Sequence, residues 1–349
     1  EVDVMRKAIS HNRGLLAVSI LLLATLVILP ILAPQYIVLQ ITLYFSYAIL
    51  ALSLAFVWGI AGIFSFGQAA FFGLGGYTYA VVAINVGEST LAVLAGLALP
   101  AVIAAVIGYF MFYGRLTSIY VAVITLVMTL IIFKFMGHTA GYEYRIGSAH
   151  LGGYNGIPGI PPLNVPGDPT TFAWPEDMFY VSGIALLLTY ISLKILIKSR
   201  LGRVLAGVRE NELRSQLLGY DVRLYKTIAF VIGATIAGLG GICFTNWNGF
   251  IDPNVFALGM SAQTIIWVVV GGLGTFFGPM FAAIALGFLA IELGAQQSLD
   301  VNLILGSILI IFVLVVPAGI VPSLLRLTVQ FRRKPLGQHK ASGQMEGEG

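Results

Sequence analysis

The sequence predicts an all-α protein, a polytopic transmembrane helical bundle of about ten spans in which some helices are broken. Hydrophobic residues make up 58% of the 349 residues and charged residues only 10%, far from the usage of soluble proteins. Glycine accounts for 41 residues, which suits membrane helices because small residues allow close approach and broken helices. The apolar residues also fall in runs of about 20, the length that crosses a bilayer.

The expected spans follow from these apolar runs. The run after Arg6, Lys7 and Arg13 resembles a signal peptide, but it lacks a convincing cleavage site, so we expect a retained first span. The eighth run is too short to cross comfortably, which predicts a tilted or partly re-entrant helix. In order, the expected spans are 15–33, 37–58, 66–86, 91–113, 117–137, 178–197, 226–248, 259–272, 275–295 and 302–325.

The loop charges predict that both termini are cytoplasmic (N-in/C-in). With ten crossings, Arg115, the segment 198–226 and the basic residues of 326–340 share the side of the N-terminus, as the positive-inside rule requires. Lys134 and Arg145 are the exceptions. We therefore interpret the net charge of +4 as a signature of membrane orientation and not of nucleic-acid binding.

The segment from Lys198 to Lys226, here called the basic segment, interrupts the hydrocarbon runs and cannot lie in a bilayer. Leu213 and Leu217 are four residues apart and would share one helix face, while Gly219 offers a left-handed helix stop. These features predict a short amphipathic helix between two spans, with a polar face that needs a partner or water.

The longest external segment, 138–177, is rich in Gly and Pro, so it cannot form a continuous helix. We expect an irregular loop against the extracytoplasmic mouth, and both a docking surface and a passive tether remain open. Residues 1–336 are expected to form a single transmembrane domain. The small, polar tail 337–349 is expected to be disordered in the cytoplasm.

Two glycine-interrupted stretches, 58–80 and 267–287, lie where one span gives way to the next. Their comparable positions, about 210 residues apart, hint at an internal repeat. Free backbone groups in a broken membrane helix must be satisfied by protein, water or substrate, so such breaks often line pathways. The alternative is that Gly73, Gly75 and Gly76 simply allow close helix packing.

Several polar residues in or near spans are candidates for a translocation path. Gln68 should face the bundle interior, as a bond between helices or towards a substrate, because an amide is costly in hydrocarbon. The residues that close the seventh span either are solvated at the interface or belong to an outer gate. The candidates are Ser65, Gln68, Phe71, Asn246, Asn248 and Gln263.

The sequence excludes several other classes. Cys243 is the single cysteine and the four histidines are scattered, so no metal site is visible. Catalytic patterns such as GxSxG and HExxH are absent, and we expect no catalytic residue. Glu292, near an external end, is the single candidate for an intramembrane acid, which argues against proton coupling. Because GxxxxGK[ST] is also absent, any ATP hydrolysis must be supplied by a partner.

Taken together, several motifs resemble the second permease of branched-chain amino acid ABC importers, a family that also serves urea and short amides. The resemblance spans most of the chain from Tyr44 to Pro322. It is carried by the runs FSFGQAAFFGLGGYTYA, RLGRVLAGVRENELRSQLLGYDVRLYKTIAF, GLGGICF, DPNVF and IIWVVVGGLGTFFGPMFAAI.

The resemblance implies an importer in the bacterial inner membrane that works by alternating access. Its expected partners are a similar second permease, two cytoplasmic ATPases that bind ATP and Mg, and an extracytoplasmic binding protein, with no cofactor in this chain. Lys198, Arg200, Arg203, Arg223 and Lys226 would mainly anchor the flanking spans. The residues that match the family's ATPase-coupling segment are Arg209, Glu210, Asn211, Glu212, Arg214 and Gly219.

The sequence constrains the identity of the substrate less than it constrains the family. Gln68 stands where many relatives carry His, and Gly272-Leu273-Gly274 fits the amino acid branch better than urea-type members, which often have Arg there. We expect branched-chain or other aliphatic amino acids. A urea or short-amide importer is the alternative, and an ion-coupled secondary transporter is the alternative of a different class.

Overall fold

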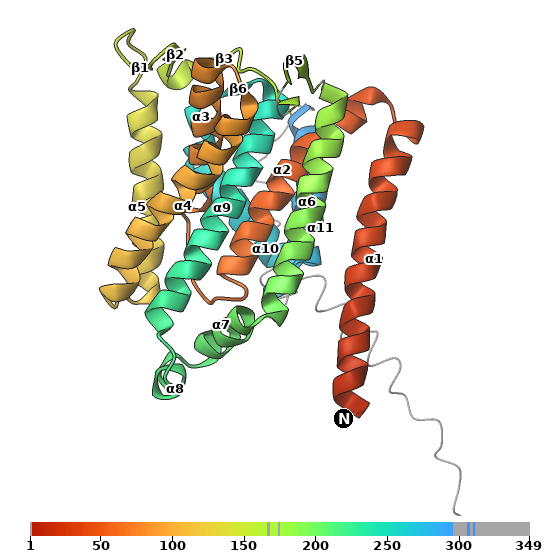
Figure 1. Ribbon diagram of the computed structural model, residues 1–349, viewed down its shortest axis with the longest axis vertical. Coiled ribbons are helices and arrows are strands. Elements are labelled where there is room, and N and C mark those ends of the chain that lie inside the picture. Colours follow the sequence, from red (N-terminus) through yellow and green to blue (C-terminus); the bar gives the residue numbers. More distant parts are fainter. Residues whose placement is uncertain (1, 166–167, 174, 296–305, 308–309, 311–349) are drawn as a thin grey trace, which may run out of the picture.

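The protein is a helical bundle with short strands at one end (Figure 1). The computed structural model describes residues 2–165, 168–173, 175–295, 306–307 and 310. Within them, seven helices are long and apolar enough to cross a membrane. The predicted all-α membrane bundle is therefore confirmed. The expected tenth span, 302–325, and the tail 337–349 lie outside the described residues, apart from positions 306, 307 and 310.

The observed helices follow the expected spans closely. Gly87 and Gly249 end two of them in the left-handed conformation, with φ of 73° and 60°, as glycine at a helix C-terminus commonly does. The first helix extends further towards the N-terminus than expected. The bounds are α1 Val2–Leu32, α2 Gln35–Val57, α3 Gln68–Val86, α4 Ser89–Tyr113, α5 Ser118–Gly137, α6 Pro175–Lys198, α9 Val222–Asn248, α10 Leu258–Gly271 and α11 Phe277–Ala295.

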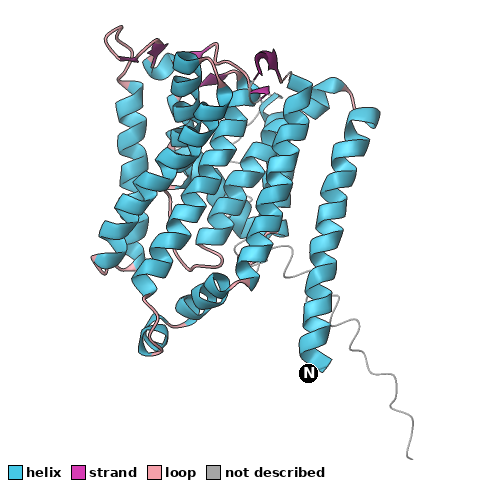
Figure 2. Ribbon diagram, in the orientation of Figure 1, coloured by secondary structure: helices cyan, strands magenta, loops and turns pink. Residues whose placement is uncertain are grey.

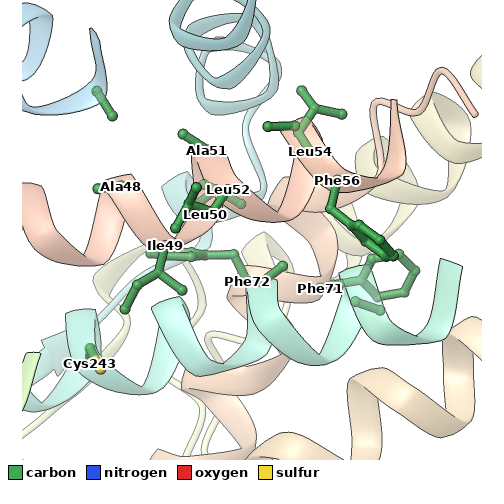
Figure 3. Close-up of a cluster of buried hydrophobic side chains, with 14 of the residues drawn as sticks. Ala48, Ile49, Leu50, Ala51, Leu52, Leu54, Phe56, Phe71, Phe72 and Cys243 are labelled. Atoms are coloured by element: carbon green, nitrogen blue, oxygen red, sulfur yellow. The ribbon is translucent and has the colours of Figure 1, made fainter. Parts of the chain in front are cut away.

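Helix α2 is the centre of the bundle. Its side chains from Ala48 to Val57 are buried on every face of the helix, which is the pattern of a helix surrounded by other helices. Figure 3 shows Ile49 and Leu50 of α2 with Phe72 of α3 and Cys243 of α9 in one cluster. Apolar residues all round α2 thus place it inside the bundle and not at the lipid surface.

Helices α3 and α9 pack with their backbones in near contact. A Cβ atom added to Gly75 would lie 2.4 Å from the carbonyl oxygen of Gly238, and one added to Gly241 would lie 1.8 Å from that of Phe72. Gly73 and Gly76 also lie inside regular helix, against Phe256 and Thr245. The packing alternative is therefore correct for these glycines, and the helix break lies earlier, between α2 and α3.

The basic segment and the outer loop occupy opposite ends of the molecule (Figures 1 and 2). The basic segment forms two helices, α7 (Arg200–Glu210) and α8 (Glu212–Leu217), where one had been expected. The strands gather at the other end. They are β1 Arg145–Ile146, β2 Ala149–His150, β3 Ile157–Pro158, β4 Asn164–Val165, β5 Asp168–Phe172 and β6 Phe250–Ile251, with 3-10 turns η1 Gly153–Asn155 and η2 Pro253–Phe256.

The outer loop is more ordered than predicted. Its strands form three antiparallel pairs, β1–β2, β4–β5 and β3–β6, the last joining the loop to the segment after α9. Asn85 Nδ2 of α3 donates to the carbonyl oxygen of Ile146 at 2.8 Å, and the backbone N–H of Ser89 donates to Asn164 Oδ1 at 2.8 Å. The prolines do prevent a continuous helix, but hydrogen bonds to helix ends hold the loop in place.

Candidate functional site at the ends of two broken helices

The chain between α2 and α3, residues 58–67, leaves the helix inside the bundle and is here called the α2–α3 break. After Val57 the turns widen, so that the N–H of Ile63 donates to the carbonyl oxygen of Val57 at 2.9 Å. Gly62 then takes a left-handed φ of 74°, which glycine adopts without steric cost. The chain is non-helical from there until α3 begins at Gln68.

Side chains of α5, of α10 and of the break itself satisfy polar backbone groups at Phe66 and Gly67. The N–H of Phe66 donates to Thr125 Oγ1 of α5 at 3.1 Å, and Ser261 Oγ of α10 donates to the carbonyl oxygen of Phe66 at 3.0 Å. Ser65 Oγ accepts the N–H of Gly67 at 3.0 Å. Because backbone groups at membrane depth need partners, these bonds stabilise the break and tie it to α5 and α10.

The second predicted break, between α10 and α11 (residues 272–276), lies directly against the first. Gly272 and Gly274 have left-handed φ values of 109° and 86°. A Cβ atom added to Gly59 would lie only 3.0 Å from the backbone nitrogen of Gly274, so the two breaks touch through their backbones. Two stretches about 210 residues apart in sequence thus form one site.

Arg209, near the end of α7, joins the basic segment to both breaks. Its Nη1 donates to the carbonyl oxygen of Gly59. Its aliphatic stem covers Gly62, where an added Cβ would lie 3.0 Å from Arg209 Cγ, and a Cβ added to Gly274 would lie 3.8 Å from Arg209 Nη1. Arg209 was predicted to belong to the ATPase-coupling segment, and the structure points its side chain inward, onto the bundle.

The inner helix of the basic segment is α7. Val204, Leu205 and Val208 are its buried apolar residues, while its other face is exposed. The amphipathic helix that packs on the bundle is therefore α7. Leu213 and Leu217 do lie four residues apart on a short helix, α8, as expected, and they are 66% and 81% exposed there.

The turn from α7 into α8 is built by residues that had been predicted as coupling residues. Asn211 ends α7 and starts α8, where its Oδ1 accepts the N–H of Arg214 at 2.8 Å, a standard N-cap. Gly219 has a φ of 87°, so the predicted left-handed stop is confirmed. Glu210 and Glu212 are exposed, and Glu212 forms an ion pair with Lys226 at the start of α9.

Lys226 and Arg223 had been expected to anchor the flanking spans. In the structure Lys226 links α8 to α9 through its ion pair with Glu212. The guanidinium of Arg223 lies over the ring of Tyr113, 5.9 Å from its centroid. Both side chains therefore connect elements of the bundle end and do not simply extend to solvent.

The predicted path residues fall into two groups. Ser65, Gln68 and Phe71 lie at the α2–α3 break and the start of α3 and are all buried. Ser53 Oγ of α2 donates to Gln68 Oε1 of α3 at 2.6 Å and also lies 2.9 Å from the carbonyl oxygen of Gly233 of α9. Gln68 therefore belongs to a polar contact that joins these three helices. Phe71 packs edge-on against Phe230 at 5.3 Å.

The other path candidates lie on α9 and α10. Asn246 is buried and Asn248 is exposed, both in the last turn of α9 at the strand-bearing end. Their side-chain amides donate to nearby carbonyl oxygens, that of Ile242 at 2.9 Å and that of Phe250 at 3.3 Å. Gln263 is half-buried on α10. The structure therefore places Asn246 and Asn248 at the strand-bearing end, whereas Gln263 follows closely after Ser261, which bonds to Phe66 of the α2–α3 break.

Sequence reasoning missed Thr125, Ser261 and Lys194. Thr125 Oγ1 also lies 2.9 Å from the carbonyl oxygen of Val121, a bond within its own helix that any membrane threonine can make, so its pattern carried no signal. Lys194 lies over the rings of Tyr190 and Phe276 at 5.5 and 5.7 Å, the latter in the α10–α11 break.

The described part of the chain shows no group of three His, Cys, Asp or Glu side chains that could hold a metal ion. Its polar side chains form hydrogen bonds between helices, satisfy backbone groups in the helix breaks, and connect the basic segment to both breaks. Such an arrangement can transmit motion between elements.

Comparison with known proteins identifies the family. The profile of the "Branched-chain amino acid transport system / permease component" family matches residues 36–314. The chain is 30% identical to the high-affinity branched-chain amino acid transport system permease protein LivM of Escherichia coli, over 80% of this chain and 69% of LivM. It is 28% identical to LivH of Salmonella typhimurium, over 80% of this chain and 92% of LivH.

A sugar permease is also similar. The ribose import permease protein RbsC of E. coli is 31% identical, over 62% of this chain and 64% of RbsC. No solved structure matches the chain significantly. These relatives are transport components and not enzymes. With a profile match over most of its length, the chain belongs to the family of membrane permease components of branched-chain amino acid transport systems.

Proposed function

We propose that this permease imports branched-chain or other aliphatic amino acids across the bacterial plasma membrane by alternating access, driven by ATP hydrolysis in a partner. The similarity to LivM and LivH, which covers more of the chain than the similarity to RbsC, supports this substrate class. Gly272-Leu273-Gly274, without the Arg that urea-type members often carry, is consistent with it.

The contact of Arg209 with both breaks is the observation that carries the mechanism. An element outside the hydrocarbon, α7, bonds through Arg209 to the α2–α3 break and lies against the α10–α11 break. The α2–α3 break is in turn bonded to α5 and α10 through Thr125 and Ser261. A displacement of α7 would therefore reach five helices, α2, α3, α5, α10 and α11, through the two breaks and their hydrogen bonds.

The exposed leucines of α8 form the docking face for the ATPase. Leu213, Leu217 and Leu218 are 66%, 81% and 71% exposed on a helix that lies outside the apolar part of the bundle. Because α8 follows closely after Arg209, which bonds to Gly59, a partner that binds these leucines would move α7 with them. Glu210, Glu212 and Arg214 are exposed around this face and would supply its polar rim.

The remaining partners are a similar second permease, a second ATPase and an extracytoplasmic binding protein. The ordered outer loop supports the docking interpretation over the passive tether, because it exposes Tyr142 by 89%, Tyr154 by 51% and Phe172 by 43%. Aromatic side chains on a held surface are typical anchors of protein interfaces. ATP and Mg would be bound by the ATPases, with no cofactor in this chain.

Ser65, Gln68 and Phe71 are buried in the conformation described here. For them to contact substrate, the α2–α3 break must shift relative to α9, which holds Gln68 through Ser53 and Gly233. We therefore assign them to the part of the path that opens when α7 moves. Asn246 and Asn248 would belong to its outer part, and Gln263 to the part beside the α2–α3 break.

Uptake by reconstituted vesicles tests the proposal. The chain is assembled with its second permease and ATPases, and radiolabelled leucine, valine and urea are compared with the binding protein present. Leucine or valine uptake that is lost with a hydrolysis-dead ATPase but survives an uncoupler supports the proposal. Uptake that collapses with the uncoupler alone indicates a secondary transporter, and uptake of urea alone indicates the urea branch.

A further inference from the structure

A cavity of about 230 Å³ lies beside the basic segment, where α4 ends and α9 begins. Its walls come from the end of α4, the α4–α5 turn, α8 and the first turns of α9. The lining residues that matter for charge are Arg115, Arg223, Lys226 and Glu212. The cavity does not include any of the predicted path residues.

The cavity is electropositive. Of its three cations, only Lys226 is paired with a carboxylate within the described residues, and that carboxylate is Glu212. The nearby carboxylate of Asp221 accepts the backbone N–H groups of Arg223 and Leu224 and does not line the cavity. The N-terminus of α9 adds further positive potential. An anion in the cavity would therefore be favoured.

Arg115 is placed at the cavity by an unusual backbone. The N–H of Leu116 donates to the carbonyl oxygen of Met111 and that of Arg115 to Phe112, the pattern of a helix stop whose left-handed position normally holds glycine. Arg115 occupies that position with a φ of 55°, although Gly114 is its immediate neighbour. The chain thus carries an arginine at a left-handed backbone position where glycine would be less strained.

Arg223 is also held in position, because its guanidinium lies over the ring of Tyr113. That ring stacks on Tyr109 at 4.7 Å, and the exposed Phe110 and Tyr120 lie on the neighbouring turns of α4 and α5. Aromatic rings of this kind mark the level of lipid headgroups. The cavity therefore opens at headgroup depth.

Exposed apolar side chains continue from this level along both helices. On α4 they are Val102 and Val106, and on α5 they are Ile119, Val123 and Val127. Their position suits two acyl chains running away from the cavity towards the middle of the bilayer. A soluble anion would make no use of these faces.

We propose that the cavity binds the headgroup phosphate of an anionic phospholipid, with Arg115 and Arg223 as the phosphate ligands. Arginine forks match phosphate oxygens, and basic pockets at the ends of membrane helices suit anionic headgroups. Lys226 adds positive charge to the cavity, whereas the negative charge of Glu212 opposes binding of the phosphate. The proposed function enters this proposal only through the choice of membrane leaflet, because it decides which side of the membrane the cavity faces. Arg115 and Arg223 would bind the phosphate in either orientation of the chain.

Native mass spectrometry of the full-length chain in detergent tests the site. Phosphatidylglycerol and phosphatidylcholine with identical acyl chains are titrated separately, and the first binding constant of each is measured. Phosphatidylglycerol is expected to bind more tightly than phosphatidylcholine. Arg223→Gln should weaken phosphatidylglycerol binding about fivefold, and Glu212→Gln should strengthen it about fivefold, as expected for one charge at a membrane surface.

Arg115→Gly is the sharpest variant, because glycine suits the left-handed position and the fold should not suffer. It is expected to weaken phosphatidylglycerol binding about fivefold with unchanged or higher thermal stability. Arg200→Gln, which removes a charge of the basic segment that does not line the cavity, should leave binding within about twofold.

Two further comparisons determine which ligand the cavity binds. Equal weakening by Arg200→Gln and Arg223→Gln would mean general surface attraction and would overturn the site, as would equal affinity for the two lipids. Glycerol 3-phosphate that binds as tightly as phosphatidylglycerol would make the ligand a soluble phosphate and overturn the lipid assignment. None of these results depends on amino acid uptake or on the ATPase, so they are independent of the proposed function.

Discussion

Arg209 donates a hydrogen bond from its guanidinium to the carbonyl oxygen of Gly59, a residue 150 positions earlier in the chain. The bond joins the end of α7 to the helix break that follows α2, the most enclosed helix of the bundle. Because Gly59 itself lies against Gly274, the same arginine reaches the second break. The basic segment is thus connected to the interior by one side chain and two glycine-rich turns.

Close packing of α3 on α9 should be very sensitive to a single methyl group. Gly241→Ala would place its Cβ on the carbonyl oxygen of Phe72, and overpacking of this kind costs about 1–3 kcal/mol. Gly259→Ala, on α10 with open space around it, is the matched control and should be neutral or stabilising. Thermal unfolding of the purified chain in detergent measures both, and equal unfolding temperatures would contradict the packing.

The bond between Ser53 and Gln68 should appear as a coupling in a double-mutant cycle. Ser53→Ala leaves the amide oxygen of Gln68 buried without its donor and should cost about 1–3 kcal/mol. In the background of Gln68→Leu, the same change should cost clearly less, because no amide remains to be stranded. Additive losses in unfolding free energy would show that Gln68 does not depend on Ser53.

The leucines of α8 should be required for assembly and not for folding. Leu213→Ser combined with Leu217→Ser changes two exposed side chains, so the unfolding temperature of the isolated chain should be unchanged. Co-purification of the ATPase should fall at least about tenfold, as expected for loss of interface anchors. Ala206→Ser, an exposed position on α7, is the control. Undiminished ATPase recovery with the double variant would refute the docking face.

Gly219 should be needed for the direction in which the chain leaves α8. Gly219→Trp meets no other atom of the chain near its Cβ but is strained at a φ of 87°. The variant should insert into the membrane at the level of the wild type and lose ATPase co-purification. Normal recovery of the ATPase would count against a role for this turn in coupling.

How much the sequence could predict depends on how local each feature is. Span positions follow from runs of apolar residues, so nine expected spans match helices within a few residues at most ends, α1 being the exception. Gly219 was also predictable, because a left-handed stop is a property of one residue. By contrast, a glycine in the sequence can mark either a helix break or a close contact between helices. Gly62 belongs to a break and Gly75 packs against Gly238, and only the structure separates these two roles.

The long-range contacts of the site could not be predicted. Nothing local distinguishes Arg209 from Arg214 in the run RENELR, and both are exposed, yet only the guanidinium of Arg209 is recorded as bonding to the α2–α3 break. Leu213 and Leu217 show the same limit, since a helical apolar pattern does not reveal whether the chain itself or a partner covers it. Thr125 and Ser261 acquire their role only from the position of Phe66.

The most direct test measures ATP hydrolysis and leucine uptake together in vesicles that contain the complete transporter with Arg209→Gln. This variant removes the bond to Gly59 and leaves the exposed face of α8 intact. Loss of a hydrogen bond from a charged group, about 1.5–3 kcal/mol, predicts that uptake per ATP hydrolysed falls at least about tenfold while ATPase recovery is normal. An unchanged ratio of uptake to hydrolysis would contradict coupling through Arg209.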